Sequence, residues 1–218
     1  MTPTVLLTGF EPFGGESVNP SWEIARALDG WICEGLAVRA VRLPCTFGDA
    51  LRTLDEAIAA HRPSLVVGLG QAGGRAEISL ERVAINVDDA RIPDNQGRQP
   101  IDAAVVPGGP AAYFTSLPIK AMTREVRAAG IAAAVSNTAG TFVCNHVFYA
   151  LMHQLATVPT LALVRGGFIH VPYTPEQVVG REGVPAMPLA DQVEGIRHAL
   201  RAAVRTREDV RETAGREH

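Results

Sequence analysis

The chain has 218 residues, of which 47% are hydrophobic and 20% are charged, and its formal net charge is −3 at pH 7. This length and apolar content are enough for one sizeable core, so we expect a single domain over residues 1–218. The mildly acidic balance and the scattered Lys and Arg residues argue against a basic surface for nucleic acid or anionic lipid. We therefore expect neither nucleic acid nor a membrane among its partners.

The N-terminal stretch MTPTVLLTGFEPFGG has no basic segment, and Gly9 and Glu11 interrupt its apolar run. It therefore predicts neither a signal peptide nor a membrane span. The three cysteines, Cys33, Cys45 and Cys144, are odd in number and far apart, which favours reduced thiols over a disulfide framework. We expect a cytoplasmic protein in which a reactive thiol is chemically allowed.

In the first half of the chain, strand-like runs alternate with helix-like segments. Asn19 followed by Pro20 is a typical helix start. The expected strands cover 4–10, 37–44, 64–70 and 78–87, and the expected helices cover 20–28 and 49–61. The proline-rich segment 88–110 contains turn signals such as PDNQG and predicts a long loop or hairpin.

The same alternation continues to the C-terminus. We expect helices over 118–130, from near Thr141, and over 188–204, with strands over 131–137 and 160–164. The last helix carries an apolar stripe at spacings of three and four, formed by Leu189, Val193, Ile196, Leu200 and Val204. Residues 205–218 are mostly charged and predict a partly frayed tail. The whole pattern indicates an α/β fold, a mainly parallel open sheet with helices on both faces.

The motif GLGQAG, residues 68–73, has the G-x-G-x-x-G spacing of dinucleotide-binding loops and follows a predicted strand. Such loops lead into a helix whose N-terminus holds the pyrophosphate. Here the next residues alternate like a strand, and the nearest acidic pair, Asp88 and Asp89, comes too early. Nucleoside or dinucleotide binding is therefore the weaker alternative. The glycines favour close approach of a ligand to the backbone.

Cys144 lies in the stretch TAGTFVCNHVFYALMH, which begins at Thr138. Its apolar residues recur at helical spacing, so a helix is predicted to begin near Thr141, with Cys144 in the first turn. Unpaired N–H groups and the positive end of the helix dipole favour a thiolate there. The alternative interpretation of such a cysteine is a small buried hydrophobic residue.

A cysteine nucleophile needs a base, and His170 is the best placed of the histidines. It follows the predicted strand 160–164 and a Gly-Gly pair, so we expect it in a loop at the carboxyl end of a strand, where active sites of open α/β sheets gather. His146 and His153 belong to the helix of Cys144, and His146 is expected to point away from the cysteine. The surface histidines are expected to be His61, His198 and His218.

Glu81 lies in the apolar extended segment ISLERVAIN, where a carboxylate requires a partner. It is a candidate to orient the imidazole of His170. An ion pair with Arg75 or Arg82 is the alternative interpretation. No arrangement of Cys, His or carboxylate residues has the spacing of a zinc site, so no metal is predicted.

Five long blocks of the sequence carry a resemblance to a known family, in the family's order. They are LLTGFEPFGGESVNPSWE, GQAGGRAEISLERVAINVDDARIPDNQG, GGPAAYFTSLPIK, VSNTAGTFVCNHVFYALMH and GGFIHVPYTPEQ. On these blocks the chain resembles, from end to end, the pyroglutamyl peptidase I family of cysteine peptidases. The resemblance implies a single three-layer α/β/α domain related to nucleoside phosphorylases, usually assembled as a homotetramer, and no cofactor.

The resemblance also implies roles for individual residues. The catalytic triad would be Cys144, His170 and Glu81, and Arg91 would help the backbone N–H of Cys144 to hold the oxyanion. The backbone of Gln71 would bond the lactam. The pyroglutamyl pocket would be lined by Phe10, Phe13, Ile92, Phe142 and Val143. The chain departs from the family at Cys45, where the family carries threonine at the pocket.

The expected activity is removal of an N-terminal pyroglutamyl (5-oxoproline) residue from peptides, by nucleophilic attack of a cysteine. One alternative is a non-catalytic or nucleoside-binding relative on the same scaffold. Another is an amidase that uses the same triad on other lactams.

Overall fold

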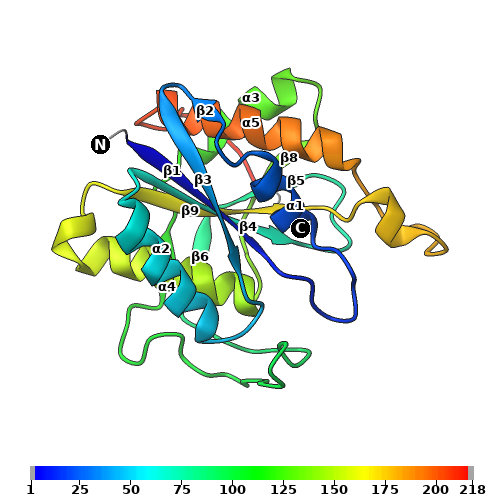
Figure 1. Cartoon of the computed structure of the whole chain (residues 1–218), viewed down its shortest axis with the longest axis horizontal. Coiled ribbons are helices and arrows are strands. Elements are labelled where there is room, and N and C mark those ends of the chain that lie inside the picture. Colours follow the sequence, from blue (N-terminus) through cyan, green and yellow to red (C-terminus); the bar gives the residue numbers. More distant parts are fainter. Residues whose placement is uncertain (1–2, 216–218) are drawn as a thin grey trace.

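A twisted sheet of seven strands forms the centre of the protein, seen in a computed structural model that describes residues 3–215 (Figure 1). The strand order is β2-β3-β1-β4-β9-β5-β8. Neighbouring strands are parallel except at the pairs β2–β3 and β5–β9, so the sheet is mainly parallel, as predicted. The strands are β1 (Thr4–Phe10), β2 (Ile32–Cys33), β3 (Leu36–Leu43), β4 (Leu65–Gln71), β5 (Ile78–Glu81), β8 (Ala133–Ser136) and β9 (Arg165–Val171).

Helices cover both faces of this sheet and complete the three layers that the sequence predicts. In Figure 1, α3 and α5 lie along one side of the sheet, and α2 and α4 along the other. α1 packs on the α5 side, in the same apolar core. The bounds are α1 (Pro20–Ala27), α2 (Asp49–His61), α3 (Ile119–Ala128), α4 (Val143–Thr157) and α5 (Leu189–Arg205).

Local sequence signals account for the start of α1 and the packing of α5. The Asn19 side chain accepts a hydrogen bond from the backbone N–H of Ser21, and Pro20 occupies the first helical position. On α5, Ile196 and Leu200 are fully buried, and the rest of the predicted stripe packs partly buried against the same core. A second core lies between α2, α4 and the opposite face of the sheet.

The predicted strand over 160–164 is wrong. Pro159–Leu161 form a short 3-10 helix, Leu163 is exposed, and the strand runs instead over Arg165–Val171. The Gly-Gly pair, which was expected to follow the strand, lies inside β9. A Cβ on Gly166 would stand 2.8 Å from Leu155, and one on Gly167 would stand 2.6 Å from Leu117. These glycines therefore allow close packing in a central strand.

The segment between residues 86 and 111 is a long irregular loop, as the sequence predicts. It connects β6 (Val83–Ile85) and β7 (Ala112–Phe114), which pair with each other in antiparallel orientation. The single extended run predicted over 78–87 is thus divided between two sheets. In Figure 1 the loop runs along the lower edge of the molecule, below α2 and α4. Backbone hydrogen bonds between Asp88 and Ala103 tie it together.

The residues after α5 differ from the expected frayed tail. The carboxylate of Asp209 accepts hydrogen bonds from the backbone N–H groups of Lys120 and Ala121, at 3.0 and 2.9 Å, and so caps the first turn of α3. The side chain of Arg165 donates to the carbonyl of Thr206. The tail is therefore docked as far as residue 215, and 216–218 lie outside the described residues.

Candidate active site

Cys144 occupies the second position of α4, in the first turn, as the sequence predicts. The helix begins at Val143, and its N-cap residue, Phe142, provides no side-chain hydrogen bond. The backbone N–H groups of a first helical turn have no acceptor within the helix. The N–H of Cys144 is one of these groups, and it is available to bind an oxygen atom next to the sulfur.

The sulfur of Cys144 packs against the sheet beside His170. A Cβ added to Gly70 of β4 would stand 2.8 Å from the Sγ atom of Cys144. Gly70 is paired in register with His170 of the adjacent parallel strand β9. Paired residues point to the same face, and neighbouring strands lie about 4.8 Å apart. The thiol and the imidazole therefore lie over adjacent positions on one face of the sheet.

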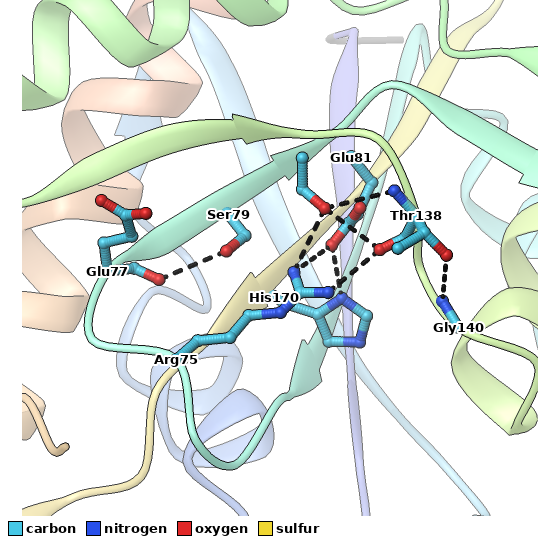
Figure 2. A network of polar contacts seen from close by, with 8 residues as sticks. Arg75, Glu77, Ser79, Glu81, Thr138, Gly140 and His170 are labelled. Carbon is cyan, nitrogen blue, oxygen red and sulfur yellow. Dashed lines mark hydrogen bonds and ion pairs between the residues drawn. The ribbon is translucent and has the colours of Figure 1, made fainter. Parts of the chain in front are cut away.

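His170 is the second-last residue of β9, inside the strand and not in a loop after it. Its Nδ1 atom lies 2.8 Å from Oε1 of Glu81 (Figure 2). Because the acceptor is a carboxylate, the proton of the neutral imidazole is on Nδ1, and Nε2 is the basic nitrogen. The antiparallel pairing of β5 with β9 brings Glu81 to this ring from 89 positions away in the sequence.

Glu81 has a second partner, which the sequence offered only as an alternative. The Nη1 atom of Arg75 lies 2.6 Å from the same carboxylate oxygen, and the Glu81 side chain is fully buried. Arg82 turns away and donates instead to the carbonyl of Ala214. Glu81 therefore contacts His170 and also forms an ion pair with arginine, so the two contacts that the sequence offered as alternatives occur together.

The environment of Cys144 differs from the thiolate site expected at a helix N-terminus. The pKa of its thiol is raised to about 12, first by burial and second by the negative charge of Glu81, while Arg75 opposes the shift. The residue as a whole is partly exposed, but its sulfur points inward against Gly70. The thiol is therefore protonated at neutral pH, and attack by its sulfur requires a base such as His170.

Aromatic rings gather beside the first turn of α4. The ring of Phe142 lies 5.9 Å from that of Phe13 and 5.5 Å from that of Phe47. Phe10 and Val143 are almost fully buried, and the ring of Phe10 packs 6.3 Å from Phe168. Phe13 and Phe142 are partly exposed, whereas Phe10 and Val143 belong to the core beneath them. Phe47 was not predicted, although it follows the end of β3 at the same edge of the sheet.

The remaining predicted residues lie in loops or at a strand end. Gln71 is the last residue of β4, and its side chain accepts a hydrogen bond from Gln177. Ile92 packs near Gly14, in the loop that contains Phe13. Arg91 is exposed, and within residues 3–215 its guanidinium makes no hydrogen bond or ion pair.

Two histidines of α4 are committed to other contacts. The Nδ1 atom of His146 lies 2.7 Å from Oδ2 of Asp88, and its Nε2 accepts a hydrogen bond from the N–H of Gly48. His153 pairs with the hydroxyl of Tyr113. The buried Asp88–His146 pair was missed because its members are 58 positions apart and no local pattern links them.

The GLGQAG motif has no phosphate-binding context. Its residues form the end of β4 and a turn, and the chain continues into β5 with no helix between them. A Cβ on Gly68 would collide with Phe168, and one on Gly73 with Tyr173. The glycines serve close packing, which disfavours the dinucleotide-binding alternative.

Comparison with known proteins identifies the family. A profile of the pyroglutamyl peptidase family matches residues 3–206. The chain belongs to the pyroglutamyl peptidase family. It is 60% identical to the pyrrolidone-carboxylate peptidase of Cupriavidus taiwanensis over 216 residues, which cover 99% of this chain and 100% of the relative. It is 58% identical to the pyrrolidone-carboxylate peptidase of Escherichia fergusonii, with 93% of this chain and 92% of that one covered.

Solved structures of this family have the same fold. The pyroglutamyl peptidase I of Bacillus amyloliquefaciens superposes with a TM-score of 0.94 at 46% identity, over 98% of this chain and all of that one. A pyrrolidone carboxyl peptidase mutant from Pyrococcus furiosus superposes with a TM-score of 0.89 at 41% identity, over 93% and 98% of the two chains. Within residues 3–215, no helix is both long and apolar enough to span a membrane.

Proposed function

We propose that this protein hydrolyses the peptide bond that follows an N-terminal pyroglutamyl residue, with Cys144 as nucleophile, His170 as base and Glu81 as the orienting carboxylate. The observation that carries the proposal is the position of Cys144 over one sheet face, beside a histidine whose Nδ1 is bonded to a buried carboxylate. Membership of the pyroglutamyl peptidase family supports the substrate class.

The proposed reaction begins with proton transfer from the thiol of Cys144 to Nε2 of His170. The sulfur attacks the carbonyl carbon of the pyroglutamyl residue and forms a tetrahedral oxyanion. The backbone N–H of Cys144 and the unpaired guanidinium of Arg91 are suited to bind that oxyanion. His170 then gives its proton to the departing amine, and the C–N bond breaks.

The thioester that remains is hydrolysed with the same groups. His170 takes a proton from water, and the resulting hydroxyl attacks the thioester carbonyl. Pyroglutamate leaves as its C–S bond to Cys144 breaks, and the thiol is protonated again. Throughout, Glu81 fixes the ring through Nδ1 and stabilises the imidazolium that forms transiently. No metal or other cofactor enters these steps.

Recognition of the lactam is proposed to use the aromatic cluster and nearby backbone groups. Phe13, Phe142 and Ile92 would contact the faces of the five-membered ring, over a floor that includes Phe10 and Val143. Apolar walls accept any ring of this size, so selectivity has to come from hydrogen bonds to the lactam, which we assign to the backbone of Gln71. Cys45 is buried and replaces the hydroxyl that the family's threonine would supply with a thiol, a weaker donor.

The function is tested by comparing three chromogenic amides that share one leaving group: pyroglutamyl, prolyl and glutaminyl. We expect efficient release from the pyroglutamyl amide. The prolyl amide lacks the lactam carbonyl and is expected to lose about 10⁴ in kcat/KM, because a buried donor is left unpaired. The glutaminyl amide is expected to be equally poor, because its ammonium would be buried among phenyl rings.

Three results would contradict the proposal. No release from the pyroglutamyl amide would favour the non-catalytic alternative. A kcat/KM for the prolyl amide within about tenfold of that for the pyroglutamyl amide, a difference of ~1.4 kcal/mol, would mean that the pocket recognises only the shape of the ring. Preference for another lactam would indicate the amidase alternative.

The cellular location and assembly also belong to the proposal. We infer a cytoplasmic enzyme, which is consistent with the three cysteines being free thiols. The homotetramer is inferred from the family resemblance alone, and light scattering on the purified protein tests it.

A further inference from the structure

The guanidinium of Arg75 joins two parts of the site that are distant in sequence. Arg75 lies in the loop between β4 and β5. Its Nη1 atom donates to Oε1 of Glu81 at 2.6 Å, and its Nη2 atom donates to the carbonyl of Thr138 at 3.0 Å (Figure 2). Nη1 also lies 3.4 Å from the hydroxyl of Ser136. One planar group therefore contacts both the carboxylate and the loop that leads to α4.

The charge of Arg75 matters because Glu81 has no access to water. The Glu81 side chain is fully buried, and its Oε2 atom has no hydrogen-bond partner among the described residues. An ionised carboxylate in such a place requires a paired cation. A neutral imidazole does not provide one. Arg75, with a side chain 28% exposed, provides that cation at Oε1, the same oxygen atom that His170 contacts.

The second contact of Arg75 reaches toward Cys144. The Thr138 hydroxyl accepts a hydrogen bond from the N–H of Gly140, and the Thr138 carbonyl accepts one from the hydroxyl of Ser136. The same segment continues along the chain through Thr141 to Cys144. The Arg75 cation is also near enough to oppose the rise in the pKa of the Cys144 thiol. Arg75 thus contacts Glu81 directly and is linked to Cys144 through the segment that begins at Thr138.

We propose that Arg75 is a positioning residue for the peptidase reaction: it holds Glu81 as an oriented carboxylate against His170 and ties it to the loop that leads to α4 and Cys144. The inference rests on the proposed function, since it names a further participant in the same site. It differs from a simple surface ion pair because the carboxylate is buried and a single guanidinium makes both contacts.

The test uses removal and chemical replacement of the guanidinium. A surface cavity of about 510 Å³ is lined by Arg75 together with Gly74, Ser136 and Thr138, so a small molecule can reach the space left by Arg75→Ala. We expect Arg75→Ala to lower kcat/KM for a pyroglutamyl amide by about 10²-fold, through misplacement of the triad. Guanidinium chloride at millimolar concentrations should raise kcat/KM of Arg75→Ala about tenfold. Urea, which has a similar shape and no charge, should not raise it.

Three further variants separate positioning from structure. Arg75→Lys keeps a cation without the planar fork and should retain more activity than Arg75→Gln. Arg82→Gln is the matched control: Arg82 is a neighbouring, partly buried arginine that bonds a carbonyl in the tail, so its loss should leave kcat/KM unchanged.

The pH profile adds a readout that a merely structural role would not move. The titratable groups around the Glu81 carboxylate are Arg75 from the β4–β5 loop, His170 from β9 and Cys144 from α4. A carboxylate that loses a neighbouring cation binds a proton more readily. The acid limb of kcat/KM should therefore move to higher pH in Arg75→Gln and stay in place in Arg82→Gln.

The outcomes are separable from those of the proposed function. If the wild-type enzyme releases no product, the function itself is wrong. If the wild type is active and Arg75→Ala matches it, the inference about Arg75 is wrong. The inference would also be wrong if the Arg75 variants lost the same fraction of kcat/KM at every pH, were not rescued by guanidinium and showed a matching fall in Tm. Arg75 would then act on stability alone. Rescue by urea as well as guanidinium would show that shape, and not charge, is required.

Discussion

The Sγ atom of Cys144 lies 2.8 Å from the point that a Cβ on Gly70 would occupy, so the position of the sulfur depends on the absence of a side chain in β4. Gly70→Ala should displace the thiol from His170 and lower kcat by about 10²-fold. Gly166→Ala is the control. A Cβ on Gly166 would also stand 2.8 Å from a side chain, that of Leu155, but Gly166 lies at the end of β9 opposite to His170. It should lower stability and leave kcat unchanged. A folded Gly70→Ala enzyme with wild-type kcat would contradict the geometry.

Cys144 should be the one essential thiol. Cys144→Ser is expected to fold and to lose at least about 10³-fold in kcat, because a hydroxyl is a much poorer nucleophile in a site built for sulfur. Cys45→Ser should keep most activity, since the Cys45 contact with Glu11 uses its backbone N–H. The two variants are compared by amide release and by circular dichroism. Retained activity in Cys144→Ser with loss in Cys45→Ser would reverse the assignment.

Alkylation of Cys144 should depend on pH in an unusual way. Its thiol pKa is raised from the ordinary 9.0 to about 12 by burial and by the charge of Glu81, so the thiolate fraction keeps increasing as pH rises through 9. The rate constant for inactivation by iodoacetamide should therefore rise about tenfold per pH unit to beyond pH 9, where an ordinary thiol levels off. Short incubations followed by activity assays measure this rate. A plateau below pH 8 would instead indicate a stabilised thiolate.

Glu81→Gln should separate the charge of the carboxylate from its shape. The amide keeps the size of Glu81 but removes the charge shared by His170 and Arg75. We expect kcat to fall by about 10²–10⁴, as when a triad carboxylate becomes neutral, with a smaller change in KM. Steady-state kinetics on the pyroglutamyl amide give both values. Unchanged kcat would leave Glu81 as a structural partner of Arg75 only.

The buried Asp88–His146 pair should contribute to stability. His146→Phe leaves the Asp88 carboxylate and the N–H of Gly48 without their partner, so we expect a loss of about 3–5 kcal/mol in the free energy of unfolding. Replacing both residues, as in Asp88→Leu with His146→Phe, should recover part of that loss. Urea unfolding of the two single variants and the double variant measures the coupling. Additive losses would show that the two side chains do not interact.

The sequence by itself determined the elements whose signals are local. The start of α1 follows from the capping residue Asn19 and from Pro20. The bounds of α2 and the stripe of α5 follow from apolar residues three or four positions apart, which interact within one helix. The place of Cys144 in the first turn of α4 is local in the same sense. These features need no knowledge of the rest of the chain.

Only the tertiary structure decided which distant residues meet. The pairing of β5 with β9 puts Glu81 beside His170, and the path of the β4–β5 loop selects Arg75 over Arg82 as its ion-pair partner. Packing also decided that the Gly-Gly pair lies inside β9, because Leu155 and Leu117 occupy the space that side chains would need. The same burial holds the thiol of Cys144 uncharged, against the preference of the helix N-terminus. Local patterns carry no information on such contacts, which depend on strand order and on what fills the space between the layers.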